Sequence, residues 1–266
     1  MLDARSPANL ILRTLTVILL LGWAWQLWRW TIPLEQFIQS YLPAISSESI
    51  HVFQQAWGLT LGLCGLIALG ADWLHSRRLL TLSMGYASLS LFLIFVLIFR
   101  SKTYQWGNLI EHSIQWTLPL VFAFYRFEPH QLKSQWALRI LIAATFFGHG
   151  LYAIGYYDVP ASYLQMVHQI FGFDAASAER FLFAAGVLDM ITVVGLLLPQ
   201  LWRYVLYYAI VWGFLTAMAR LVAYWDASIW LESLDIWLNQ TLIRLGHGGL
   251  PLVLWLLERG KMANTQ

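Results

Sequence analysis

The chain has few charged residues and only one cysteine. Charged residues make up 11% of the sequence, whereas an ordinary soluble domain carries about 25%. The lone cysteine, Cys64, excludes an internal disulfide and a Cys-X-X-Cys redox centre. No basic run suggests nucleic-acid binding, and neither an HExxH motif nor a comparable ligand cluster suggests a zinc site. No stretch reads as a separate soluble domain.

Hydrophobic residues fill the chain instead, at 59% of the total. A helix of about 20 apolar residues crosses a hydrocarbon layer of ~30 Å. Eight continuous stretches reach or approach this length, and we predict eight transmembrane helices from them. The predicted spans lie near residues 10–30, 52–72, 79–99, 108–126, 138–157, 180–200, 203–222 and 237–257.

The second half of the sequence repeats the first. The offset runs from 126 residues, between Gly22 and Gly148, to 132 residues, between Pro119 and Pro251. We therefore predict an all-α integral membrane protein built from two tandem four-helix bundles, residues 1–130 and 131–266. Four helices per repeat make the two repeats parallel, as in the halves of some transporters. The first apolar run resembles a signal peptide, but its partner lies mid-chain, so we interpret it as a retained helix.

The distribution of Lys and Arg predicts the orientation of these helices. If the helices alternate in direction, ten basic residues fall on one side of the membrane and five on the other. Cytoplasmic loops carry the excess of positive charge. We therefore expect both termini in the cytoplasm, in what we take to be a bacterial inner membrane. The ten are Arg5, Arg13, Arg77, Arg78, Arg126, Lys133, Arg139, Arg203, Arg259 and Lys261.

Ionisable side chains inside a membrane are costly and mark candidate sites. In the eighth span, Arg244 and His247 precede Pro251 on one narrow stripe of a helix. In the fourth, His112 and Gln115 precede Pro119 with the same spacing, and Glu111 lies beside them. Superposing the two Leu-Pro-Leu-Val segments that contain these prolines places His112 on Arg244 and Gln115 on His247.

The fifth and sixth spans supply the other candidates. His149 lies between two glycines, with Tyr152 on the same face, and Asp189 lies in the sixth span. At about 1.5 Å per residue, His149, Asp189 and His247 lie at depths compatible with one polar cluster. Trp23 and Leu61 replace His149 and Asp189 in the first repeat, so we expect any site in the second.

Three interpretations of this cluster stay open. Asp189 and Arg244 could form an ion pair that only joins two helices. The cluster could instead hold a quinone or another small apolar molecule, with the two histidines exchanging protons. Two of His112, His149 and His247 could also ligate a haem.

The second half resembles the DoxX family of four-helix membrane proteins. The resemblance rests on Leu138-Arg139, Gly148-His149-Gly150, Pro160, Gly186-Val-Leu-Asp189 and Gly195. The family usually has Glu where this chain has Asp189, and a lysine after the His-Gly step where this chain has Tyr152 and Ala153. The resemblance implies a four-helix bundle and a redox-associated membrane subunit.

We therefore expect a redox-associated membrane subunit with a quinone-sized pocket in the second repeat. The alternatives are a small-molecule transporter with its pathway between the repeats, and a purely structural subunit of a larger membrane complex. Enzymatic activity stays undecided, and the expected partners are the lipid bilayer and other subunits.

Overall fold

The computed structural model describes residues 6–74, 76–127 and 135–263, and these ranges are helical without any strand. The chain divides into two compact units. The first unit comprises Met1–Leu109 and Gln115–Lys133, and the second comprises Ile110–Ile114 and Ser134–Gln266. A short segment from the middle of the chain, Ile110–Ile114, therefore belongs to the second unit.

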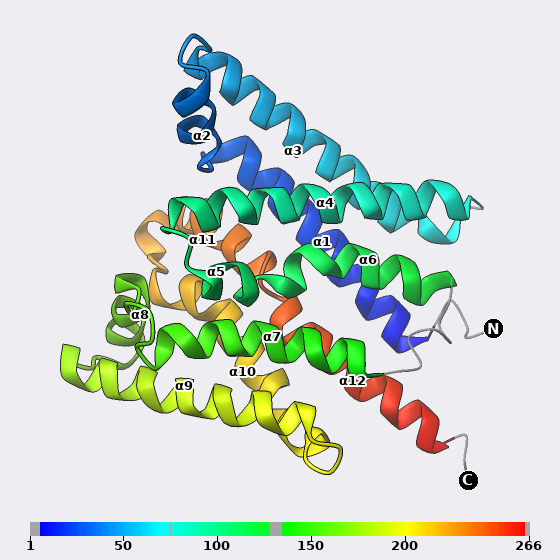
Figure 1. Ribbon diagram of the computed structural model, residues 1–266, viewed down its shortest axis with the longest axis vertical. Helices are drawn as coiled ribbons and strands as arrows, with labels where there is room; N and C mark the ends of the chain where they lie inside the picture. Colours follow the sequence, from blue (N-terminus) through cyan, green and yellow to red (C-terminus); the bar gives the residue numbers. More distant parts are fainter. Residues whose placement is uncertain (1–5, 75, 128–134, 264–266) are drawn as a thin grey trace. The chain divides into compact units, whose positions relative to one another are not determined.

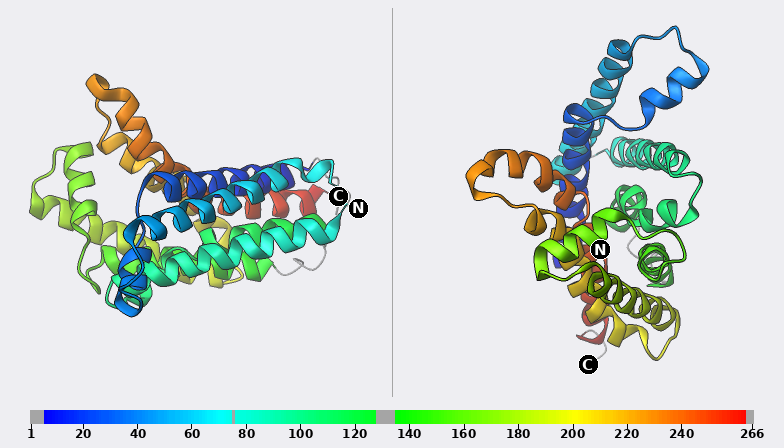
Figure 2. Two further views of the ribbon diagram at one scale, coloured as in Figure 1. Left: turned by 90° about the horizontal axis from the view of Figure 1, so that it is seen from above. Right: turned by 90° about the vertical axis from the view of Figure 1, so that its left-hand side faces the viewer.

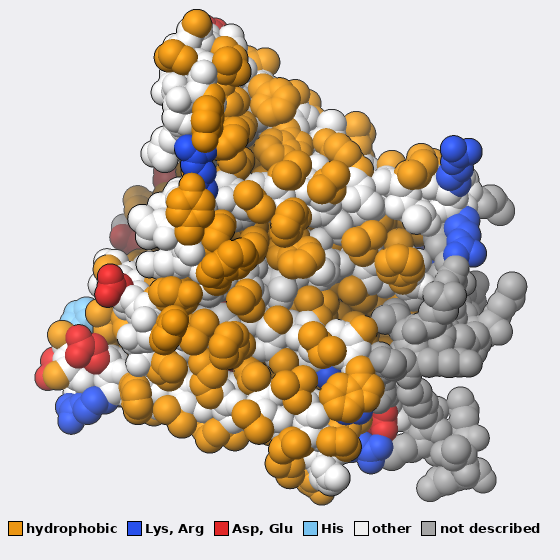
Figure 3. Space-filling model, in the orientation of Figure 1, with side chains coloured by type: hydrophobic (Ala, Val, Ile, Leu, Met, Phe, Trp, Pro, Cys, Tyr) orange, Lys and Arg blue, Asp and Glu red, His pale blue; other side chains and the backbone are white. Residues whose placement is uncertain are grey.

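Six helices in the described part of the chain are long and apolar enough to cross a membrane. Hydrophobic side chains cover most of the helix surface seen in Figure 3, and the charged side chains lie mainly near helix ends. This surface is what a bilayer requires, because lipid replaces water around the helices. The six helices are α1 (Pro7–Arg29), α3 (Ser47–Leu69), α4 (Arg77–Ser101), α7 (Gln135–Ala153), α9 (Ala175–Leu197) and α10 (Trp202–Ala223).

The two other predicted spans are interrupted. The fourth is divided at His112 into α5 (Trp106–Glu111) and α6 (Ser113–Phe127). The eighth is divided at residues 243–245 into α11 (Trp230–Leu242) and α12 (Gly246–Ala263). We expected one continuous helix in each place. Each break lies seven residues before a proline inside the following helix, Pro119 in α6 and Pro251 in α12.

Local sequence signals explain where several helices begin. The side chains of Ser46, Ser76 and Asp174 accept hydrogen bonds from backbone amides in the first turns of α3, α4 and α9, respectively. Each of them satisfies an amide that has no partner within its helix. Two shorter helices, α2 (Leu34–Tyr41) and α8 (Ala161–Phe171), occupy the loops where we expected surface helices. Gly172 ends α8 in the left-handed conformation that glycine tolerates best, at φ 70°.

The second unit places α7 and α9 side by side, with α8 across the end where the chain passes between them (Figures 1 and 2). Helix α10 packs against α8, α9, α11 and α12, and α12 also packs against α7. In the first unit, α3 packs against α1, α2 and α4. Helices α7 to α10 and α12 position the site described next.

Candidate functional site

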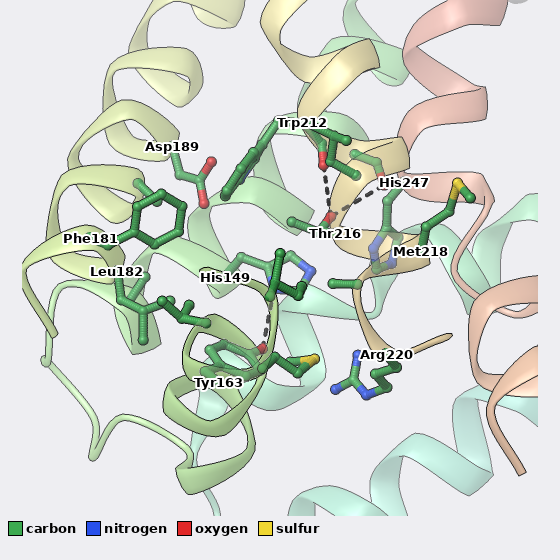
Figure 4. Close-up of a pocket in the computed structure, with 18 of the residues that line it drawn as sticks. His149, Tyr163, Phe181, Leu182, Asp189, Trp212, Thr216, Met218, Arg220 and His247 are labelled. Atoms are coloured by element: carbon green, nitrogen blue, oxygen red, sulfur yellow. Dashed lines mark hydrogen bonds between the residues drawn. The ribbon is translucent and has the colours of Figure 1, made fainter. Parts of the chain in front are cut away.

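The second unit encloses a cavity of about 300 Å³. Its wall is mostly apolar and comes from α7, α8, α9, α10 and the start of α12 (Figure 4). Ligand pockets in proteins have volumes of roughly 300–1,000 Å³ and the same mixture of an apolar wall with a few polar groups. The ionisable side chains that line it are His149, Tyr163, Asp189, Arg220, Arg244 and His247.

Two histidines meet at this cavity. The rings of His149 and His247 lie edge to face, with their centroids 5.2 Å apart. His247 is only 2% exposed, and its Nε2 atom has no hydrogen-bond partner among the residues of the described ranges. The Nε2 atom of His149 likewise has none there. Both rings therefore keep a buried nitrogen without a partner in these ranges.

This contact between the rings bears on haem binding. Two histidines that ligate one haem iron lie on opposite faces of the porphyrin. Because His149 and His247 touch each other directly, no porphyrin fits between them in this arrangement.

The break between α5 and α6 brings Glu111 and His112 to the same place. One carboxylate oxygen of Glu111 lies 3.3 Å from Nδ1 of His112, and the other lies 3.5 Å from Nδ1 of His149. Glycine at 148 permits this approach, because a Cβ there would lie 2.4 Å from the backbone nitrogen of Glu111. Real Cβ atoms do not come so close, so Gly148 is required by the backbone of the opposing segment.

Tyr163 joins the group from α8. Its hydroxyl lies 3.4 Å from Nδ1 of His149, and Figure 4 shows both side chains at the cavity. Burial raises the pKa of the Tyr163 hydroxyl above its ordinary value, and the Glu111 carboxylate acts in the same direction. Tyr163 therefore stays protonated at physiological pH and can donate a hydrogen bond.

Asp189 and Arg244 both line the cavity, but they do not form the ion pair that we considered. Asp189 accepts a hydrogen bond from the Tyr208 hydroxyl at 3.0 Å. Arg244 donates through Nη1 to the carbonyl oxygen and to the side-chain oxygen of Gln240, both at 2.8 Å. Each group thus has a neutral partner from a neighbouring turn or helix, and the expected pairing is wrong.

Two other predicted residues lie away from the cavity wall. Tyr152 is buried and packs against the ring of Tyr157, with the ring centroids 5.2 Å apart. Gln115 belongs to the first unit, where its side-chain oxygen accepts a hydrogen bond from the Trp23 indole at 3.2 Å. Of the secondary candidates, the structure therefore brings only Glu111 and His112 to His149.

The sequence did not point to Tyr163 or Arg220. Tyr163 lies in the loop between two predicted spans, and Arg220 lies near the end of the seventh predicted span. The sequence did mark Arg220 as unusual, because Arg203 and Arg220 are the only charged residues in α10. Figure 4 shows the guanidinium of Arg220 on the same side of the cavity as Tyr163 and His149.

One flank of the cavity is formed by apolar side chains that are also exposed on the surface. Phe171 of α8 is 52% exposed, and Leu215, Met218 and Val222 of α10 are exposed to a similar degree. The cavity therefore lies next to an apolar part of the protein surface.

Within the described ranges, no group of three or more His, Cys, Asp or Glu side chains is arranged to hold a metal ion. No protein-family model, no curated protein and no solved structure matches the chain. The residues of the cavity are thus the main guide to function.

Proposed function

We propose that this multi-pass membrane protein binds one lipid-soluble, quinone-sized molecule in the cavity of its second unit. The observation that carries the proposal is the mixture of apolar and ionisable side chains in the wall of that cavity. Its wall combines exposed apolar side chains with His149, His247 and Arg220. Such a cavity suits a molecule with an apolar tail and a polar head.

The proposed architecture is a tandem repeat of two four-helix bundles that crosses the membrane eight times. The two interrupted helices support it, because the breaks fall at aligned positions, His112 and Arg244. The broken segments would complete the fourth and eighth crossings, which is possible where irregular backbone is buried in protein or lines a cavity.

We further propose that both termini lie in the cytoplasm, in a bacterial inner membrane, as the positive-inside rule predicts. Reporter fusions test this orientation. Fusions after Ala263 and after Lys133, which lies outside the described residues, should both report the cytoplasm. A fusion after Asp174 should report the opposite side, and a cytoplasmic signal there would refute the topology.

The resemblance to DoxX proteins supports a narrower role as a redox-associated subunit whose ligand is a quinone. Quinone reduction takes up protons as well as electrons. His149, His247 and Asp189 are ionisable groups at the cavity wall that can exchange protons. A cofactor-bearing partner subunit would supply the electrons.

A transporter is the second candidate, and the interrupted helices favour it. Transporters often form their substrate sites from discontinuous helices, whose ends carry partial charges. In this chain, one break contributes His112 beside Glu111, and the other contributes Arg244 to the cavity wall.

Gentle purification followed by three measurements tests these roles. A bound lipid-soluble molecule, identified by mass spectrometry of the extracted protein, is the expected result. A co-purifying cofactor-bearing protein with its absorption spectrum would support the redox role, whereas flux into liposomes would support transport. A protein that carries no ligand, recruits no cofactor-bearing partner and shows no flux would be a structural subunit, and the proposal would be wrong.

A further inference from the structure

Two arginines bring positive charge to the cavity wall. Arg220 and Arg244 both line it, and neither has a carboxylate within ion-pair distance in the part of the chain that the structure describes. Arg244 uses only Nη1, for its two bonds to Gln240. Arg220 makes no hydrogen bond to any described side chain or backbone group.

The two buried carboxylates of the same unit form no ion pair with either arginine in the described part of the chain. Glu111 is in contact with the rings of His112 and His149. Asp189 accepts a hydrogen bond from Tyr208. A charged side chain that lines a cavity of a membrane protein without an ion-pair partner marks a candidate binding site.

We propose that the bound molecule is a single-chain amphiphile with a carboxylate head, of the fatty-acid type. The carboxylate lies between Arg220 and Arg244, where planar guanidinium groups can each donate two parallel hydrogen bonds. The protonated hydroxyl of Tyr163 supplies a further donor. This inference rests on the proposed ligand-binding function and names the chemical class of the ligand.

The position of the ligand's apolar tail follows from the residues that line the same cavity. The exposed apolar side chains of Phe171, Leu215 and Val222 form the flank that borders the lipid. A volume of about 300 Å³ lies at the lower end of the range for ligand pockets. It suits one chain with a compact head better than a two-chain lipid, and the remainder of the tail extends into the bilayer.

Equilibrium binding to the full-length protein in nanodiscs tests the class of ligand. The probes are palmitate, hexadecanol with a similar tail but no charge, and decylubiquinone as a neutral quinone. We expect palmitate to bind at least about tenfold more tightly than hexadecanol, because only the carboxylate can accept charge-assisted hydrogen bonds from the two guanidinium groups. Equal affinity for palmitate and hexadecanol would overturn the inference.

Variants of Arg220 then test whether the arginines bind the carboxylate head of the ligand. Arg220→Gln should reduce palmitate affinity by about tenfold or more and leave hexadecanol affinity unchanged, whereas Arg220→Lys should retain part of the preference. Arg180→Gln is the matched control, because Arg180 is exposed and bonds only within its own helix. Retained hexadecanol binding shows that each variant is folded. A full palmitate preference in Arg220→Gln would overturn the inference.

The same experiment separates this inference from the proposed function. If decylubiquinone binds and palmitate does not, the site is a ligand site but not an acid site, and only the inference fails. If none of the three probes binds to the wild-type protein, both fail.

Discussion

Three residue pairs that the predicted sequence repeat matches have opposite character in the two units. In the first unit, the Trp23 indole donates to Gln115, and Phe95 packs edge-on against Trp23 at a centroid distance of 5.3 Å. Leu61, on α3, is fully buried. In the second unit the corresponding residues are His149, His247 and Asp189, which line a cavity.

The difference contrasts a packed interior with a set of residues that lines a cavity. The Trp23 indole N–H and the Gln115 side-chain oxygen satisfy each other, while the side-chain nitrogen of Gln115 has no partner in the described part of the chain. Two histidine rings are smaller than an indole ring with its amide partner, and both keep a nitrogen without a partner in the described part of the chain. Buried polar groups are normally satisfied in proteins, and buried atoms without a partner occur in both units. Those of His149 and His247 belong to residues that line the cavity.

The largest expected effect is the loss of bound ligand, which we expect only from changes in the second unit. We expect His149→Leu and His247→Leu to abolish retention of the lipid-soluble ligand, because each removes a ring nitrogen at the cavity. His112→Leu should have an intermediate effect, since His112 contacts Glu111 but does not line the cavity itself. Ligand content per purified protein, determined by mass spectrometry, checks the outcome.

The matching change in the first unit is Trp23→Phe, which should leave ligand content unchanged. Equal expression and equal thermal unfolding of the variants would show that ligand loss is not a folding defect. If Trp23→Phe lost the ligand and both histidine variants kept it, the site would lie in the first unit.

The next effect is on stability and compares two glycines, one from each unit. Gly148→Ala would place a methyl group 2.4 Å from the backbone of Glu111, and we expect it to destabilise the protein by about 1–3 kcal/mol, as overpacking typically does. Gly85→Ala meets no atom within 4 Å and should be neutral or slightly stabilising, since alanine favours helix. Unfolding in detergent with added denaturant measures both, and equal effects would contradict the close approach.

Hydropathy was sufficient to predict six helices of the fold. Continuous apolar runs such as α4 and α9 have few alternatives in a chain with so little charge. The interruptions were not predicted, because His112 and residues 243–245 lie within otherwise apolar or amphipathic segments. A proline distorts a helix mainly at the preceding turn, and Pro119 and Pro251 lie further than that from the breaks.

The depth of each candidate residue along its helix predicted that several of them lie at one level of the membrane. Depth does not show which of these residues contact each other. Asp189 and Arg244 do line one cavity, yet their partners are Tyr208 and Gln240. Which way a side chain points depends on the rotation of each helix, and sequence spacing fixes that only within one helix. For a similar reason Tyr163 was not predicted, because the packing of α8 in the folded chain places it at the cavity.

A smaller effect distinguishes the observed pairing from the expected one. Asp189→Asn and Tyr208→Phe should be coupled, because the two side chains share a hydrogen bond. Such bonds between membrane helices contribute about 0.6 kcal/mol on average and up to about 1.7 kcal/mol. Asp189→Asn and Arg244→Met should be additive within about 0.5 kcal/mol, as for groups without shared partners. Double-mutant cycles of unfolding free energy measure both, and strong coupling between Asp189 and Arg244 would contradict the structure.

The smallest effect comes from two helix caps in corresponding loops. Ser46 caps α3 through a bond to the Ser49 amide at 3.2 Å, and Asp174 caps α9 through a bond to the Ser177 amide at 2.8 Å. The hydrogen bonds from Ser177 hold the pKa of the Asp174 carboxyl below its ordinary value. Only the cap of the second unit can therefore change its charge with pH.

The direction of this pH dependence follows from the lowered pKa. The folded state binds the proton at Asp174 more weakly than the unfolded state does, so the carboxylate cap stabilises α9 fully above the unfolded pKa. The contribution is lost as the pH falls through the folded pKa. Asp174→Asn keeps a capping oxygen without the charge, so the stability gap between wild type and this variant should narrow as the pH is lowered through that range. Because Asp174 is exposed, the gap should be small, and hydrogen exchange of the first-turn amides of α9 is the sensitive measurement. Ser46→Asn in the first unit should show no such pH dependence in α3, and an equal dependence in both helices would mean that the caps do not cause it.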